Sequence, residues 1–258
     1  MELDDIIISR AITESFAREF SQAMETEVAV AGAGPSGLTA AYYLAKTGIK
    51  TVIFERNLRT GGGMPGGGMM FNKIVVQESA LEILQELEIR TELYQEGYYL
   101  ANSLEAASAL TYRAIKEGVK IFNLIGVEDV MVKENRVCGL VINWQAVTLT
   151  QLQVDPLSIR CQMAVDATGH GCEIIRKLLE RSSVKLATPE GKIMGEGAMW
   201  AEKGEKAIID NTGEVYPGLY VSGMAANAVY GSPRMGPIFG GMLLSGKKIA
   251  DLIIEQLR

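Results

Sequence analysis

The sequence predicts an α/β fold around a mainly parallel sheet, with a dinucleotide-binding unit near the N-terminus. The run VAVAGAGPSGLTAAYYLA, which begins at Val28, has the pattern of a strand, a glycine turn and a helix. Strand and helix patterns alternate near both ends of the chain, and residues around 127–153 have the pattern of an antiparallel β-hairpin insertion. We find no internal repeat or low-complexity linker, so we expect residues 1–258 to form one domain.

The first element expected is a helix over residues 9–24. Its apolar side chains recur every four residues and form one stripe, made by Ile12, Phe16, Phe20 and Met24. We expect this stripe to pack on the body of the fold or on a neighbouring subunit.

A strand–helix–strand unit is expected next, over residues 27–55, around the motif G-x-G-x-x-G. Gly32 permits the tight turn out of the strand, and Gly34 leaves room for a pyrophosphate to approach the backbone. Gly37 lets the helix pack close to the sheet. The motif therefore predicts an adenine dinucleotide site.

Two further residues of this unit fit such a site. Ser36 lies where the N–H groups of the helix point outward, at the positive end of the helix dipole. Glu55 ends the second strand, 23 residues past Gly32, near the spacing of an acid that accepts a ribose hydroxyl.

The glycine-rich segment at residues 61–70 is expected to be a loop that covers a ligand, because glycine lets backbone lie close to a ligand. The remaining patterns predict helices, strands and one turn at Glu134–Asn135. Helices are expected at 77–89, 103–117, 171–181 and 236–257, and strands at 120–123, 127–132, 136–143, 147–166 with a break at Asp155–Pro156, and 219–223.

Composition excludes several classes of protein. The net charge of −6 argues against nucleic acid as the main partner. The glycines and Pro35 argue against a membrane span over residues 28–45, and we expect no membrane partner. The N-terminus lacks the basic region of a signal peptide, and the three cysteines form no C-x-x-C motif. We therefore expect a cytoplasmic protein.

The N-terminal fingerprint and the returning strand VDATG resemble the two-dinucleotide-binding flavoprotein superfamily. In that superfamily a late strand usually ends in Gly-Asp, and the aspartate holds the ribityl chain of the flavin. Here the matching residues are Gly223 and Met224. Because methionine cannot accept hydrogen bonds from several hydroxyls, this difference argues against bound FAD.

More specific motifs resemble the thiamine thiazole synthase family of archaea and eukaryotes. They are GGGMPGGGMMF, VEDVMV, VINW, VDPL, DATGH and SGMAANAVYGSPRMGPIFGGMLLSG, and the resemblance covers nearly the whole chain. It implies an octameric, iron(II)-dependent enzyme that builds an ADP-linked thiazole carboxylate from NAD, glycine and a sulfur atom, with release of nicotinamide. NAD would be consumed as a substrate.

His170 and Asp155 are the candidate metal ligands. His170, the only histidine, follows a strand end, where α/β sheets place their ligands, and Asp155 precedes Pro156. On the residues alone, a lone histidine such as His170 is more often structural than a ligand, and Asp155 could equally be a turn-forming Asp-Pro. The resemblance implies that both bind iron, with Asp155 reaching in from an adjacent subunit. An imidazole and a carboxylate suit iron(II) and leave positions open for substrate.

The resemblance assigns further roles within the same site. Arg234, whose guanidinium could clamp a carboxylate or simply lie in solvent, would bind glycine or the imine made from it. Glu55 and Arg56 would contact the adenosine side of NAD, and Met224 would pack on the nucleotide. Gly63, Val127 and Val154 match family positions that line the pocket.

Gln153 departs from both family patterns. In eukaryotic members a cysteine at this position gives up its own sulfur, and archaeal members that use sulfide usually have histidine there. An amide is neither a sulfur donor nor a good base, and no cysteine falls in this motif. We therefore expect sulfide-dependent, catalytic turnover. Two alternatives stay open: an FAD-dependent oxidoreductase, and a nucleotide-binding isomerase or sensor that has lost thiazole chemistry.

Overall fold

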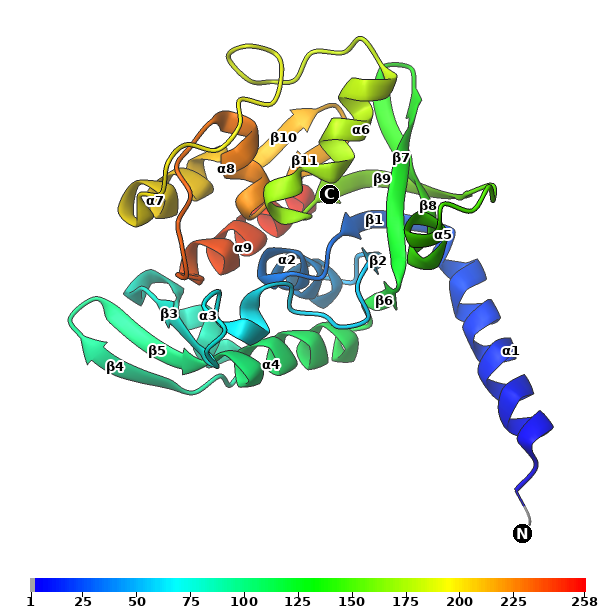
Figure 1. Cartoon of the computed structure of the whole chain (residues 1–258), viewed down its shortest axis with the longest axis horizontal. Helices are drawn as coiled ribbons and strands as arrows, with labels where there is room; N and C mark the ends of the chain where they lie inside the picture. Colours follow the sequence, from blue (N-terminus) through cyan, green and yellow to red (C-terminus); the bar gives the residue numbers. More distant parts are fainter. Residues whose placement is uncertain (1–2) are drawn as a thin grey trace.

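The computed structural model describes residues 3–258, and its centre is one mixed sheet with a parallel core. The parallel strands lie in the order β11-β9-β1-β2-β6, and β10 pairs antiparallel with β11 at the edge. This arrangement confirms the α/β class (Figure 1). The strands are β1 (Glu25–Ala31), β2 (Thr51–Glu55), β6 (Lys120–Asn123), β9 (Leu157–Asp166), β10 (Gly213–Tyr216) and β11 (Leu219–Val221).

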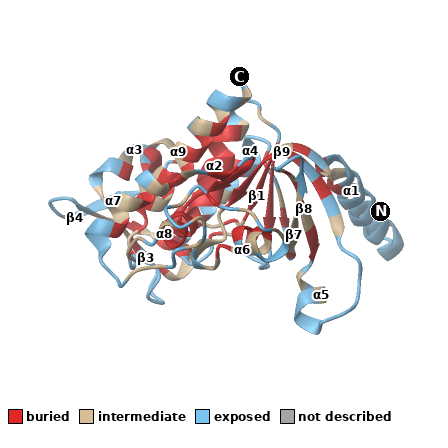
Figure 2. Ribbon diagram, turned by 90° about the horizontal axis from the view of Figure 1, so that it is seen from above, coloured by how far each residue is buried: buried red, intermediate tan, exposed pale blue. Residues whose placement is uncertain are grey.

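Alternating side chains of β1 supply two separate hydrophobic cores. Val28 and Val30 face the core beneath the helices α2 (Pro35–Lys46), α4 (Ser103–Lys116) and α9 (Gly240–Leu257). Ala29 and Ala31 face the opposite core, which contains residues of β8 (Arg136–Trp144) and α6 (Glu173–Arg181). Figure 2 shows these two layers on either side of the sheet.

The antiparallel insertion is confirmed, with different bounds. β7 (Ile125–Lys133) and β8 form a hairpin that turns at Glu134 and Asn135, both with positive φ, as the type I′ turn requires. β8 then pairs antiparallel with the first half of β9, which joins the hairpin to the parallel sheet.

The strand expected over residues 147–166 is wrong in its first half. Residues Gln145–Thr150 form a helix, α5, which projects from the body of the molecule (Figure 2). The run VTLT is rich in β-branched residues, but no neighbouring strand is available there, because the pairing of β8 with β7 ends at Trp144. Only from Leu157 onward does the chain return to the sheet.

A small three-stranded sheet was not predicted. It contains β3 (Lys73–Val76), β4 (Thr91–Gln95) and β5 (Tyr98–Asn102), all antiparallel. The helix expected over 77–89 is correspondingly shorter: a 3₁₀ turn at Glu78–Ala80 leads into α3 (Leu81–Glu86). The 61–70 segment contains a short 3₁₀ turn, Met64–Gly66.

The two ends of the chain differ in detail from the prediction. α1 (Asp5–Ala23) begins earlier than expected because Asp4 caps its first turn. The end of its apolar stripe packs on the body: Phe20 is buried, and the ring of Phe16, although partly exposed, contacts Phe122 edge-on. Ile12 is exposed on a helix that projects outward (Figure 1). At the other end α9 begins at Gly240, and two helices were not predicted, α7 (Ala201–Asn211) and α8 (Met224–Tyr230). Within the described residues, no helix is long and apolar enough to cross a membrane.

Candidate functional site

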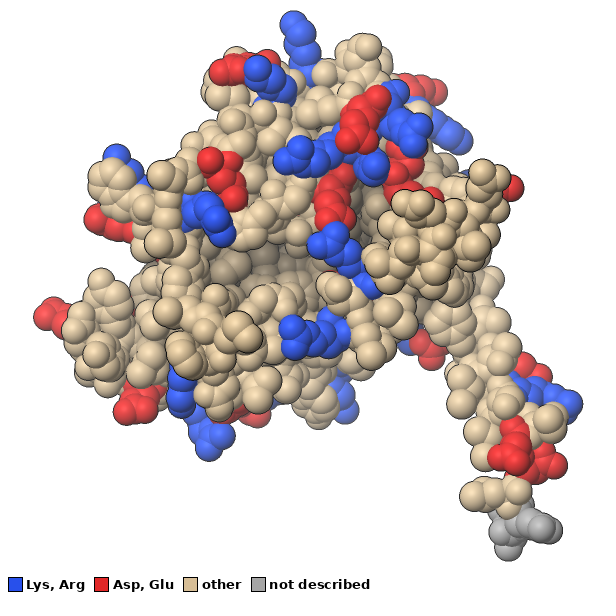
Figure 3. All heavy atoms as spheres, viewed as in Figure 1, with Lys and Arg blue, Asp and Glu red and all other residues tan. Residues whose placement is uncertain are grey.

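A cavity of about 580 Å³ opens at the carboxyl ends of the parallel strands. Its wall includes Ala31 at the end of β1, Glu55 at the end of β2, Thr168 after β9 and Ser222 after β11. Figure 3 shows a hollow in this face, with both basic and acidic side chains around its rim. Carboxyl ends of parallel strands are where open α/β sheets bind their ligands.

The turn between β1 and α2 has the shape that its glycines predict. Gly32 has φ +99°, and a Cβ on it would lie 2.5 Å from the carbonyl oxygen of Ala167. A Cβ on Gly37 would lie 2.1 Å from the carbonyl oxygen of Gly32, so Gly37 serves packing and does not line the cavity. Gly34 does line it, and a Cβ there would meet nothing within 4 Å.

Two polar side chains fix this turn in place. Ser36 is buried beside the cavity and shares a short hydrogen bond with the hydroxyl of Ser222. Glu55 is 4% exposed, and its carboxylate accepts hydrogen bonds from the N–H of Ala33 (2.8 Å) and from the N–H (2.8 Å) and amide (2.7 Å) of Asn57. A carboxylate has about four acceptor positions, so Glu55 retains capacity for one further donor.

Arg56 forms an ion pair with Glu173, which lies at the start of α6. Both side chains are partly exposed and both line the cavity. A ligand that takes a hydrogen bond from Arg56 would therefore compete with Glu173, a residue that the sequence did not single out.

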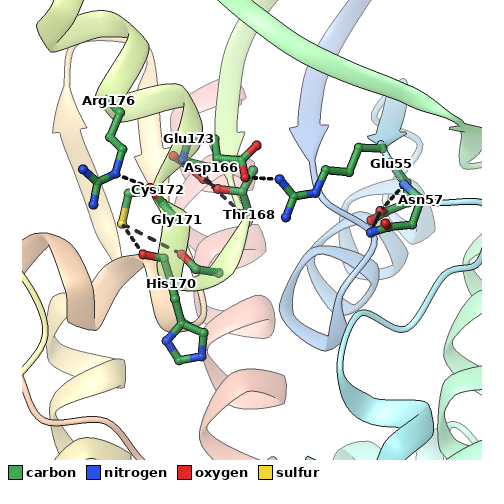
Figure 4. A network of polar contacts seen from close by, with 11 residues as sticks. Glu55, Asn57, Asp166, Thr168, His170, Gly171, Cys172, Glu173 and Arg176 are labelled. Atoms are coloured by element: carbon green, nitrogen blue, oxygen red, sulfur yellow. Dashed lines mark hydrogen bonds and ion pairs between the residues drawn. The ribbon is translucent and has the colours of Figure 1, made fainter. Parts of the chain in front are cut away.

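The loop after β9 is held by a buried carboxylate. Asp166 accepts hydrogen bonds from the N–H (3.0 Å) and hydroxyl (2.6 Å) of Thr168 and from the N–H of Ile175 in α6 (3.1 Å). Burial raises the pKa of Asp166. These bonds fix the segment that carries His170, whose ring points away from them (Figure 4).

His170 and Arg234 meet at one carboxylate, that of Glu196. The imidazole Nδ1 lies 2.6 Å from Glu196 Oε1, and the Arg234 Nε lies 3.8 Å from Glu196 Oε2. His170 and Arg234 both line the cavity. Sequence reasoning missed Glu196 because it lies in a long coil without a motif or periodic pattern.

Most of the site residues expected from the sequence gather in this cavity. Those lining it are Gly32, Gly34, Ser36, Glu55, Arg56, Gly63, Val127, His170, Met224 and Arg234. The glycine-rich segment at residues 61–70 contributes Gly62, Gly63 and Gly68 to the cavity wall.

Besides Gly37, which packs the turn, the exceptions are Gln153, Val154 and Asp155. They are exposed in the coil between α5 and β9, and none of them lines the cavity. Among residues 3–258, no three His, Cys, Asp or Glu side chains cluster so that they could hold a metal ion. His170 lines the cavity and Asp155 does not, so a single copy of the chain does not place both residues at the cavity wall.

None of the three cysteines reaches the cavity wall. Cys161 and Cys172 are buried and Cys138 is half-buried. Burial raises the pKa of the Cys161 thiol to about 12, and burial also raises the pKa of the Cys172 thiol. These two thiols are packing residues without thiolate character.

The fold and the cavity together define an α/β protein with a Rossmann-like sheet and a cavity at the carboxyl ends of its parallel strands. At the level of fold alone, the chain is similar to a geranylgeranyl bacteriochlorophyll reductase-like protein from Thermoplasma acidophilum. The TM-score is 0.59 at 15% identity, over 90% of this chain and 79% of that chain.

The chain belongs to the Thi4 family, whose pattern matches residues 9–239. It is 57% identical, over the full length of both chains, to the thiamine thiazole synthase of Methanothermobacter thermautotrophicus. It is also similar to the crystal structure of THI4 from Thermovibrio ammonificans, with a TM-score of 0.96 and 48% identity over 100% of this chain and 99% of that chain. The resemblance expected from the motifs is thereby confirmed.

Proposed function

We propose that this chain is a sulfide-dependent thiamine thiazole synthase. It would convert NAD, glycine and sulfide to an ADP-linked thiazole carboxylate and release nicotinamide, with Fe(II) as cofactor. The observation that carries the proposal is one cavity that combines the β1–α2 dinucleotide turn with His170 and Arg234. Membership of the Thi4 family supports the reaction class.

The nucleotide would lie along the carboxyl ends of β1 and β2. Its pyrophosphate would lie over the turn at Gly34 and Ser36, where backbone N–H groups at the start of α2 favour an anion. The remaining acceptor position of Glu55 would take a ribose hydroxyl, and Arg56 would leave Glu173 to contact the adenosine side. Met224 would pack on the nucleotide.

The substrate amino acid would bind near His170. Arg234 is 59% exposed at the cavity wall, and its guanidinium suits a two-point contact with the carboxylate of glycine. Because Arg234 and the β1–α2 turn line the same cavity, glycine and the sugar carbons of NAD would meet there.

The residues fit a bound Fe(II) ion. An imidazole whose Nδ1 contacts a carboxylate is typical of metal-ligating histidines, and His170 has that arrangement with Glu196. Asp155 would complete the donor set from an adjacent subunit. When bound, Fe(II) would supply Lewis-acid coordination of substrate and sulfide.

A metal site that takes Asp155 from another copy requires an oligomer. We infer that the chain forms a homo-oligomer, an octamer, and that it acts in the cytoplasm. The segment that carries Asp155 is exposed and lies beside the exposed apolar side chains of Leu149, Leu152 and Val154. Apolar side chains grouped on a projecting segment favour contact with another copy of the chain.

The experiment that tests the proposal is a turnover assay without oxygen. Protein is incubated with NAD, glycine, Fe(II) and sulfide, and released nicotinamide is counted per chain. Sulfide-dependent catalysis predicts many equivalents per chain and none when glycine or sulfide is left out. Release of no more than one equivalent, with loss of a protein sulfur atom, would contradict the catalytic version.

A further inference from the structure

We propose that Glu196 is the positioning residue of this site: its two carboxylate oxygens set the tautomer of His170 and the orientation of Arg234. The inference rests on the proposed roles of those two residues. Glu196 is the most buried of the three, with its side chain 16% exposed against 54% for His170 and 59% for Arg234. A carboxylate between two more exposed groups is suited to hold both.

Backbone hydrogen bonds hold Glu196 and Arg234 at a fixed separation. The segments 194–200 and 228–234 run side by side, and Gly197 forms a parallel β-bridge with Pro233. The N–H of Gly197 donates to Ser232 O (3.0 Å), and the N–H of Trp200 donates to Arg234 O (2.9 Å). The coil that carries Glu196 is thus tied to the segment that carries the arginine.

The contact with His170 decides which ring nitrogen carries the proton. A carboxylate can only accept, so the 2.6 Å contact places the proton of a neutral ring on Nδ1. Nε2 then keeps its lone pair, and the hydrogen bonds of the described residues leave that atom unpaired. Nε2 is therefore preorganised as a metal ligand, with no proton to displace.

The contact with Arg234 decides which of its donors face a substrate. Glu196 Oε2 lies nearest to Nε, on one edge of the guanidinium. The two terminal nitrogens of Arg234 lie outside that contact and form a fork that can bind a carboxylate. Glu196 thereby limits how the guanidinium can turn at the cavity wall, and its negative charge offsets that of Arg234.

The tautomer can be observed without any activity assay. His170 is the only histidine in the chain, so untagged protein labelled with ¹⁵N-histidine gives one pair of ring nitrogen signals. Spectra of metal-free protein are recorded well above the pKa of imidazole. We expect the Nδ1–H form in the wild type and in Glu196→Gln, whose amide oxygen can still accept, and a shift toward the Nε2–H form in Glu196→Ala.

The second readout is direct binding of Co(II), used as a spectroscopic probe. We expect Glu196→Ala to weaken Co(II) binding by about 10–100-fold, the usual effect of removing a group that orients a ligand. Glu196→Gln should bind Co(II) nearly as the wild type does, yet show a raised KM for glycine, because its amide N–H₂ faces the Arg234 Nε. Glu190→Ala, which removes an exposed carboxylate of the same coil, is the matched control.

The outcomes separate this inference from the proposed function. If His170→Ala leaves Co(II) binding unchanged, the metal site itself is wrong. If His170→Ala abolishes binding while Glu196→Ala keeps both the affinity and the Nδ1–H form, the role of Glu196 is wrong and the site stands. Equal effects of the glutamine and alanine variants on tautomer, Co(II) affinity and glycine KM would also overturn it.

Discussion

At the scale of single residues, Cys172 shows why proximity does not make a thiol reactive. It lies two positions after His170, but its side chain is fully buried and its Sγ contacts the carbonyl oxygen of Ala225 at 3.5 Å. Burial disfavours the thiolate and raises the pKa of the thiol. Sulfur donation requires a thiolate that can reach the substrate, and Cys172 meets neither condition.

We therefore expect Cys172→Ala to retain repeated release of nicotinamide. The substitution should lower the free energy of unfolding by roughly 1–2 kcal/mol, because it leaves a small cavity. The measurement is nicotinamide per chain at a temperature well below the unfolding midpoint, with Cys138→Ala as the comparison. Activity that stops at one equivalent in the wild type and disappears in Cys172→Ala would make this cysteine the sulfur donor.

The residues found from sequence and those missed differ in the kind of signal they leave. His170 and Arg234 stand beside glycines and prolines in recognisable motifs, and the structure brings both to the cavity. Glu196 has no such signal, because its role depends on two segments, 194–200 and 228–234, that only the tertiary fold aligns. Residues that act through other residues are the ones that a sequence pattern does not reveal.

At the scale of elements, two neighbouring glycines of the β1–α2 turn have different roles: Gly32 is needed for folding, and Gly34 leaves space at the proposed binding site. Gly32 combines a positive φ with a Cβ position 2.5 Å from a backbone oxygen, so any side chain there displaces the chain after β9. Gly34 has an ordinary φ of −78°, and its Cβ position is open toward the cavity.

We expect Gly32→Ala to reduce the free energy of unfolding by at least about 3 kcal/mol, since strain at positive φ and a backbone clash add. Gly48→Ala is the matched control: Gly48 has φ +88°, but its Cβ would meet nothing within 4 Å, so a loss of only about 1–2 kcal/mol is expected there. Denaturant unfolding measures both. Equal losses of unfolding free energy in the two variants would show that the contact with Ala167 adds nothing to the cost of Gly32→Ala.

Gly34→Ala should give the opposite result. Its free energy of unfolding should stay within about 0.5 kcal/mol of the wild type, because the added methyl group touches no protein atom. NAD should bind at least about tenfold more weakly, equivalent to roughly 1.4 kcal/mol. Calorimetric titration with NAD checks this, and unchanged affinity would place the pyrophosphate away from this turn.

Elements with strong local patterns were predictable, and elements defined by their neighbours were not. The β1–α2–β2 unit, the hairpin turn at Glu134–Asn135 and α4 follow directly from glycine positions and periodicity. α5 has the composition of a strand but no strand to pair with, and every residue of β4 is exposed, which removes the alternation that marks a strand. The secondary structure of α5 and of β4 therefore depends on their tertiary neighbours and not on their local sequence.

At the scale of the whole molecule, the cavity of one copy does not include Asp155, the proposed second metal ligand. His170 lines the cavity, whereas Asp155 is exposed on a segment beyond α5 that leaves the body of the molecule. A site shared between copies explains why such an exposed segment carries a carboxylate of the proposed metal centre.

Complementation tests this sharing. Asp155→Ala and His170→Ala should each abolish turnover. Co-expression of both variant chains should restore roughly a quarter of wild-type activity, because random mixing pairs an intact histidine with a neighbour's intact aspartate at that share of the interfaces. Size-exclusion chromatography with light scattering confirms that mixed oligomers form. Mixed oligomers without any recovered activity would place both ligands in the same chain or remove one of them from the site.

The most direct measurement is mass spectrometry of the small molecules released from protein incubated with NAD, glycine, Fe(II) and sulfide. The proposed function predicts free nicotinamide together with an ADP-linked thiazole carboxylate whose mass shifts with labelled glycine and labelled sulfide. Release of FAD from the purified protein, with NAD recovered intact, would contradict it.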